Sequence, residues 1–139
     1  MRLVADFSTA QDWDPGIARS ERRGDGPVGL GSRFAVVARF RGREVPMDYA
    51  ITAWDPPRRL VVRGEGDRAV AEDTVTFAPA AGGGTRVTYA GELRMKGVLR
   101  LAGPFLGGTF RRLGAEALDG LEAWLSERCG AAPGEPPIA

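Results

Sequence analysis

Apolar and polar residues alternate in several short segments, as they do in strands that bury one face. In residues 33–40, the alternation places Phe34, Val36, Ala38 and Phe40 on one side. A glycine at position 42 permits a tight turn, after which Val45, Met47, Tyr49, Ile51 and Ala53 share one side. The two segments predict an antiparallel hairpin with one buried face.

Further strands are predicted on both sides of this hairpin. Prolines 56 and 57 end the second strand, because proline cannot donate to a ladder. Residues 59–63 form a short strand whose facing stays open, since Leu60, Val62 and Val61 are all apolar. Two longer segments follow: residues 68–78 align Ala71, Asp73, Val75 and Phe77, and residues 85–95 align Val87, Tyr89, Gly91 and Leu93. With a polar edge strand at residues 17–24, the pattern predicts an antiparallel meander.

The apolar period then changes from two to between three and four residues, which is typical of an amphipathic helix. The stripe consists of Phe110, Leu113, Ala117, Leu121 and Trp124, widened by Leu106, Leu118 and Leu125. We expect a helix over residues 104–129 and a disordered tail over residues 130–139. Four glycines (107, 108, 114 and 120) each cost this helix about 1 kcal/mol relative to alanine. Either they permit close approach of another segment, or they reflect the high glycine content of the chain.

One amphipathic helix on one face of a curved antiparallel sheet makes a two-layer α+β domain. We expect a cavity between the concave face and the helix, because several inward positions are small: Ala38, Ala53, Gly91 and Ala117. A completely filled core is the alternative.

Composition narrows the class of protein. With 139 residues, 43% of them hydrophobic, and a net charge of +1, the chain predicts a single folded domain. It has no apolar run of the roughly 18 residues that a membrane helix needs, and no secretory signal pattern. The single cysteine, Cys129, excludes an internal disulfide. We therefore expect a cytoplasmic domain without stable membrane insertion.

The absence of histidine excludes Ser-His and Cys-His nucleophilic pairs and histidine metal sites. We expect no metal and no cofactor. The near-zero net charge argues against a nucleic-acid partner. Residues 24–29 satisfy the glycine pattern of dinucleotide-binding loops, but they lead into a strand, so no helix N-terminus is available for a pyrophosphate.

Several segments, taken in order, resemble the SRPBCC superfamily of START-like, helix-grip proteins, which includes polyketide cyclases/dehydrases and lipid-transfer proteins. They are Ala-Asp-Phe-Ser at 5–8, Trp-Asp-Pro-Gly at 13–16, Val-Gly-Leu-Gly at 28–31, Trp-Asp-Pro-Pro-Arg-Arg-Leu at 54–60, Gly-Thr-Arg-Val-Thr-Tyr at 84–89 and the leucine-rich last helix. The resemblance covers residues 3–127. It implies a short N-terminal helical segment and a seven-stranded sheet that grips the last helix around a hydrophobic pocket.

The chain departs from this pattern at its start. Family members begin with a strand ahead of the first helical segment, whereas here Met1 lies almost at that segment, so we expect six strands within residues 1–129. Either the coding start lies upstream, or the sheet has two unpaired edges that invite pairing with another chain. In the second case we expect a homodimer or a poorly stable protein.

Asp73 is the most informative inward residue, because a carboxylate on an apolar face must be paired, protonated or near water. It is either a general acid/base, with Tyr49 or Tyr89 donating a hydrogen bond to an enolate, or a solvent-facing residue on a twisted strand. The candidate ligand-lining residues are Trp13, Phe34, Val36, Met47, Tyr49, Tyr89, Phe105, Leu106, Thr109 and Phe110. Plain core packing is the competing role for each of these side chains.

Three hypotheses for function follow. The first is a carrier that binds a hydrophobic or aromatic small molecule, such as a lipid or polyketide. The second is a cofactor-independent polyketide cyclase or dehydratase that uses Asp73 and the tyrosines. The third is a stress- or partner-responsive module without ligand chemistry.

Overall fold

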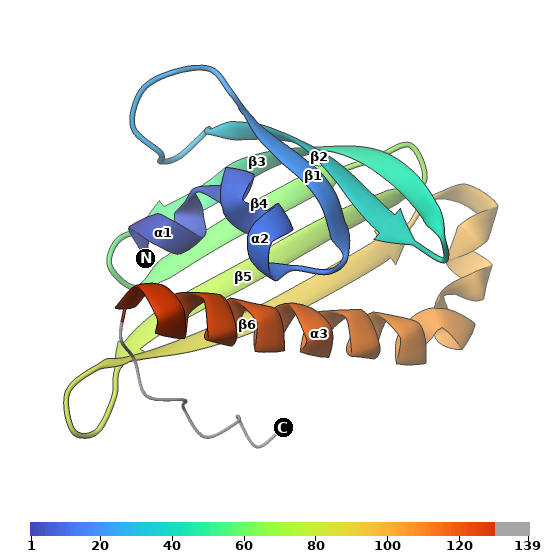
Figure 1. Ribbon diagram of the computed structural model, residues 1–139. Helices are drawn as coiled ribbons and strands as arrows, with labels where there is room; N and C mark the ends of the chain where they lie inside the picture. The colour runs from blue at the N-terminus through green and yellow to red at the C-terminus, as the bar shows by residue number, and fades with distance from the viewer. Residues whose placement is uncertain (130–139) are drawn as a thin grey trace.

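A curved antiparallel sheet wraps around one long helix (Figure 1). The structure, a computed structural model, describes residues 1–129, apart from the side chains of residue 99 and residues 102–110. The strands are β1 Ile17–Arg23, β2 Arg33–Phe40, β3 Arg43–Asp55, β4 Arg59–Glu65, β5 Ala69–Pro79 and β6 Thr85–Met95. The helices are α1 Arg2–Ala5, η1 Phe7–Thr9, α2 Ala10–Trp13, η2 Gly97–Ala102 and α3 Gly103–Cys129.

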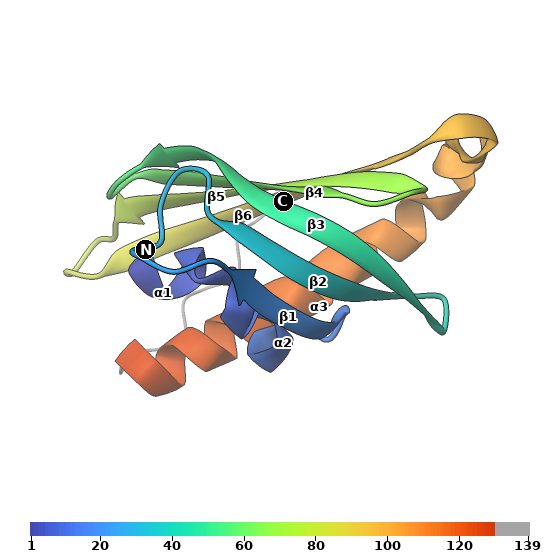
Figure 2. The same ribbon diagram turned by 90° about the horizontal axis from the view of Figure 1, so that it is seen from above.

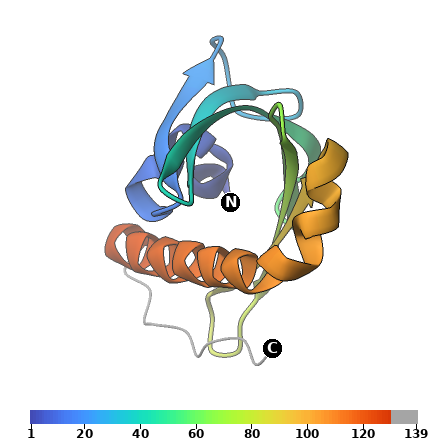
Figure 3. The same ribbon diagram turned by 90° about the vertical axis from the view of Figure 1, so that its right-hand side faces the viewer.

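The six strands pair in chain order, each antiparallel to the next. The predicted meander and the predicted α+β class are confirmed. Seen from above and from one end, the sheet curls over α3, with the short N-terminal helices inside the curl (Figures 2 and 3). The tail predicted over residues 130–139 lies outside the described residues.

The core lies between the concave face of the sheet and the helices. Its largest fully buried side chains are Phe34, Val36, Ile51, Leu60, Val62 and Leu121. Leu60 and Val62 belong to the core cluster and Val61 does not, which settles the facing that the sequence left open for residues 59–63. Most of the predicted alternation is confirmed, because the strand period of two assigns each side chain to one face.

One inward assignment was wrong. A register shift between Ile51 and Ala53 places Ala53 opposite Val61, and Trp54 opposite the core residue Leu60. Trp54 therefore packs against the core and Ala53 does not. A β-bulge adds a residue to one strand and reverses the alternation beyond it, which a strict period of two cannot anticipate.

The edge formed by β1 is contacted by the N-terminal helices at Ser20. The Ser20 backbone N–H donates to Gln11 Oε1 at 2.9 Å, and the Ser20 hydroxyl donates to the Phe7 carbonyl at 2.7 Å. The η1–α2 segment thus satisfies polar groups along this edge and holds the N-terminal helices against it. The strand β6 forms the other edge of the sheet.

The inner face of α3 consists of Ala117, Leu121 and Trp124, all of them buried. Gly120 lies directly against the end of α2: a Cβ built on it would collide with the Trp13 carbonyl oxygen and lie 2.9 Å from the Trp13 carbonyl carbon. At Gly114, by contrast, a Cβ would meet nothing within 4 Å. Close approach therefore explains the glycine at position 120 but not the one at position 114. Within residues 1–129, no helix combines the length and apolar character needed to cross a bilayer.

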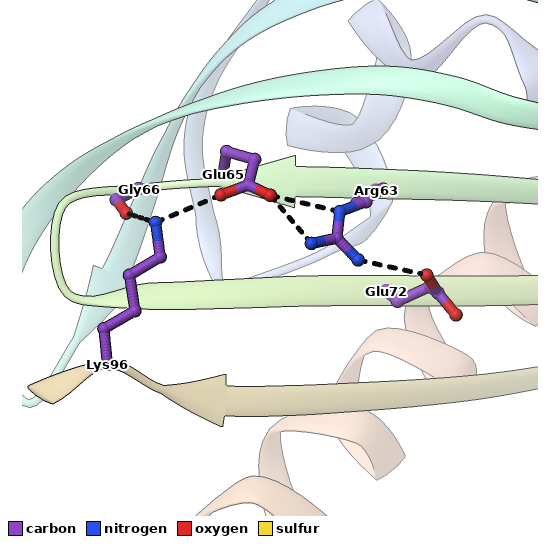
Figure 4. A network of polar contacts seen from close by, with 5 residues as sticks. All are labelled: Arg63, Glu65, Gly66, Glu72 and Lys96. Carbon is purple, nitrogen blue, oxygen red and sulfur yellow. Dashed lines mark hydrogen bonds and ion pairs between the residues drawn. The ribbon is translucent and has the colours of Figure 1, made fainter. Parts of the chain in front are cut away.

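The convex face of β4, β5 and β6 carries a network of paired charges (Figure 4). Arg63 pairs with Glu65 at 2.8 Å and with Glu72 at 3.6 Å, while Lys96 reaches Glu65 at 3.0 Å and the Gly66 carbonyl at 2.9 Å. The cations lower the pKa of Glu65. Because these groups are close to solvent and satisfy one another, we interpret the network as a solvated outer surface.

Candidate functional site

A carboxylate lies on the apolar concave face, at Asp73 of β5. Its neighbours on this face of the strand are Ala71 and Val75, and Asp73 itself is only 9% exposed. Across the sheet, Asp73 pairs with Val62 on β4 and Gly91 on β6. A Cβ at Gly91 would lie 3.0 Å from Asp73 Oδ1, so the glycine makes room for the carboxylate.

Tyr89, on β6, lies close enough to Asp73 for the two side chains to influence each other's pKa. Burial raises the pKa of Asp73 to about 7; the Tyr89 hydroxyl opposes this rise, and the negative charges of Asp14 and Glu72 add to it. Burial also raises the pKa of Tyr89, which keeps its hydroxyl protonated as a donor. At neutral pH, Asp73 can therefore both release and accept a proton, as a general acid/base must.

Tyr49, on β3, lies flat across Gly64 of β4. A Cβ at Gly64 would overlap the Tyr49 ring, which is 2.7 Å away at Cδ2, so the neighbouring strand needs a glycine there. The other face of the ring stacks on Phe7, with centroids 5.1 Å apart. Burial, followed by the charges of Asp73 and Asp14, raises the pKa of Tyr49.

Asp14 is a second, partly buried carboxylate, which the sequence did not single out as a site residue. It follows α2, and its Oδ1 accepts a hydrogen bond from the Gly16 N–H at 2.7 Å. Burial raises the pKa of Asp14, the Gly16 hydrogen bond lowers it, and the negative charge of Glu116 raises it further. Asp-Pro-Gly is a turn signature, so the sequence signal for this residue indicated a loop and not a site.

The comparisons with known proteins place this arrangement in a family. A family model described as polyketide cyclase/dehydrase and lipid transport matches residues 1–125. The chain belongs to this family. No curated protein matches the chain.

Solved structures share the fold of this polyketide cyclase/dehydrase and lipid transport family member. A protein from Thermus thermophilus is 24% identical, with a TM-score of 0.66, over 94% of this chain and 88% of that chain. A START superfamily protein from Mycobacterium smegmatis is 19% identical, with a TM-score of 0.60, over 91% of this chain and 83% of that chain. A conserved protein from Geobacillus kaustophilus is 19% identical, with a TM-score of 0.60, over 89% and 84% of the two chains. The fold is the helix-grip fold of START proteins.

In this family member, the candidate residues divide into two groups. Trp13, Phe34, Val36 and Met47 are buried in the core beside Tyr49. The side chains of Phe105, Leu106, Thr109 and Phe110 lie outside the described residues. Phe7, which the sequence did not single out, joins the first group: its ring makes edge contacts with Trp13 and Phe34, each at 6.1 Å. Aromatic packing therefore fills the interior beside the N-terminal helices.

Two buried donors at the contact between α2 and α3 lack an acceptor. The indole N–H groups of Trp13 and Trp124 are buried and have no hydrogen-bond partner in the described part of the chain. The Arg128 guanidinium lies 4.2 Å from the centre of the Trp124 ring, and because it is a donor it cannot accept from the indole N–H. A buried unpaired N–H is unfavourable, so these two donors are a cost to the stability of the fold.

Proposed function

We propose that the chain binds a hydrophobic or aromatic small molecule, of lipid or polyketide type, between the concave face and α3. The observation that carries this proposal is the pair of the buried Asp73 and the partly buried Tyr89, on a largely apolar sheet face beneath an amphipathic helix. Ligand sites in proteins are mostly apolar, with a few convergent polar groups that orient the ligand. The family description, with its lipid transport, supports the same class of ligand.

The proposed occupant has an apolar body and at least one carbonyl or hydroxyl oxygen. We assign the apolar contacts to Phe34, Val36 and Met47 on the sheet, together with Phe105, Leu106, Thr109 and Phe110 on α3. Asp73, Tyr89 and Tyr49 would meet the polar atoms. The unpaired indole donors of Trp13 and Trp124 favour a ligand with acceptor oxygens over a pure hydrocarbon.

A second candidate, a polyketide cyclase or dehydratase, is favoured by the pKa of Asp73 near neutrality. In this reaction the Asp73 carboxylate takes a proton from a carbon between two carbonyls, leaving an enolate that the Tyr49 or Tyr89 hydroxyl stabilises by a hydrogen bond. The enolate carbon attacks a second carbonyl, a C–C bond forms, and protonated Asp73 returns its proton to the new alkoxide. The step balances without a cofactor.

Native mass spectrometry of freshly purified protein tests the proposal. We expect a co-purified hydrophobic compound, and binding of anthraquinones or fatty acids added to the stripped protein. With a synthetic poly-β-ketone thioester, Asp73→Asn should lower turnover at least tenfold if Asp73 is the base, with affinity changed by less than about threefold. Lys96→Gln, on the convex face, serves as the control. Protein without bound compound that also fails to bind either class would overturn the proposal.

We further propose that β6 pairs with β6 of a second copy, because β6 is an exposed eleven-residue edge strand. If the pairing is symmetric, antiparallel and centred on the exposed Ala90, then Ala90 of one protomer lies directly opposite Ala90 of the other. Sedimentation velocity should show a dimer for the wild type and a monomer for Ala90→Lys, since the two lysines would repel each other. A wild-type monomer that unfolds cooperatively would contradict this pairing.

The single exposed thiol, Cys129, fits the cytoplasmic location that we propose.

A further inference from the structure

A cleft opens at the end of the molecule where the β2–β3 hairpin approaches α3, the end that Figure 3 faces. Its volume is about 380 Å³. The hairpin supplies Gly42, three arginines and one carboxylate: Arg39, Arg41, Arg43 and Glu44. Helix α3 supplies Leu113 and Glu116, and the Pro15–Gly16 turn closes one side. Three guanidinium groups, from both sides of one turn, therefore line the same cleft.

The charges in this cleft are not balanced within it. Arg39 donates to the Pro15 and Ile17 carbonyls, both at 3.3 Å, and not to Glu44, its partner across the hairpin. Glu116 is already paired with Arg112, at 2.8 Å. Arg41 and Arg43 have no ion pair within the part of the chain that the structure describes. In the described part of the chain, the cleft therefore holds two arginines without an ion pair, Arg41 and Arg43, and one such carboxylate, Glu44.

The turn at the tip of the hairpin gives a second, independent observation. Arg41 and Gly42 form the turn with positive φ angles of 50° and 76°. Such two-residue turns favour asparagine, aspartate or glycine at the first position, because other side chains are strained there. An arginine at this position is unfavourable for the turn itself, and strained residues of this kind gather at binding sites.

The cleft also lies at the outer end of the interior face of α3. Leu113, which is half-buried, stands one turn before the buried Ala117 on the stripe that continues to Leu121. A ligand that contacts Leu113 could therefore extend from the arginines into the region between the concave face and α3, where we propose that the apolar ligand binds.

We propose that this cleft binds the anionic end of an amphiphilic ligand, a carboxylate or a phosphate, whose apolar part runs past Leu113 beneath α3. This inference rests on the proposed function and adds the charge of the ligand to it. Guanidinium groups pair with carboxylate and phosphate oxygens through two parallel hydrogen bonds, which suits Arg41 and Arg43 to either group.

The test compares cis-parinaric acid with its uncharged methyl ester, by fluorescence titration. We expect wild-type protein to bind the acid about tenfold more tightly than the ester, and Arg41→Asn and Arg43→Gln each to reduce this preference about three- to tenfold. Arg86→Gln, an exposed arginine at the opposite end of the sheet, should change nothing. Competition with dodecyl phosphate and with dodecanoate distinguishes the two anions.

Arg41→Asn gives a further readout, because asparagine suits the turn better. Its melting temperature should rise while its affinity for the acid falls, whereas a purely structural role would raise the melting temperature alone. Equal binding of acid and ester by the wild type would overturn the anion site and leave the proposed function standing. Binding of neither probe would overturn this inference together with the proposed function for lipids.

Discussion

Gly120→Ala is expected to destabilise the protein by at least about 3 kcal/mol, which lowers the melting temperature by about 10 °C. The new methyl group would collide with the main-chain oxygen of Trp13, and a backbone atom cannot move aside as a side chain can. Relief requires α2 to move away from α3, which would disturb the packing of Trp13 on Phe7. Urea unfolding, followed by tryptophan fluorescence and circular dichroism, measures the loss.

Gly114→Ala is the matched control on the same helix. A Cβ at Gly114 meets nothing within 4 Å, so the substitution should stabilise the protein by up to about 1 kcal/mol through helix propensity alone. Opposite signs at positions 120 and 114 would assign the effect to the α2–α3 contact. Similar changes in stability for the two variants would mean that α2 does not press on α3 in solution.

Asp73→Asn should have the second large effect, and one that depends on pH. The folded-state pKa of about 7 lies above the unfolded value of 3.8. Between these values the unfolded chain loses the proton while the folded protein keeps it, so wild-type stability falls as pH rises from about 4 to about 7. Above pH 7 the ionised carboxylate costs about 4 kcal/mol, and asparagine removes this cost.

We therefore expect Asp73→Asn to unfold at higher urea concentration than the wild type at pH 8, with the difference vanishing near pH 4. The pKa of Asp14 is also raised, so the stability of the variant should still fall somewhat as the pH rises. Glu65→Gln is the control of opposite sign. The pKa of Glu65 is lowered in the folded protein, so its ionised form stabilises the fold at any pH above the pKa of the unfolded chain. The substitution should therefore be slightly destabilising at pH 8. A variant that is no more stable than the wild type at pH 8 would contradict the raised pKa of Asp73 in the folded protein.

Both predictions concern residues, Gly120 and Asp73, that the sequence analysis named without deciding their roles. Alternation on residues 68–78 placed Asp73 on the inward face, and the structure confirms that placement. The pairing of Asp73 with Gly91 and its reach to Tyr89 depend on the register of β5 and β6. Register comes from pairing across a turn, so the spacing within one strand cannot supply it.

Other features were beyond the reach of a local pattern. The bulge near Ile51 exchanged the faces of Ala53 and Trp54, since one extra residue reverses every later position. At the edge of β1, Ser20 meets Gln11, which lies nine positions earlier in the chain. Asp14 escaped notice because its turn signature explained it fully at the local level.

Periodicity in the amino-acid sequence was sufficient to predict four of the strands, the long terminal helix, the faces of most of their residues and the two-layer class. The spacing of apolar residues within one helix or strand follows from the burial of one of its faces, so it can be recognised without knowing the rest of the fold. Only the tertiary structure decided which glycine a neighbour needs, which carboxylates share the interior and which arginines line one cleft. These are meetings between segments far apart in the chain, and their distances depend on how the sheet curves around the helix.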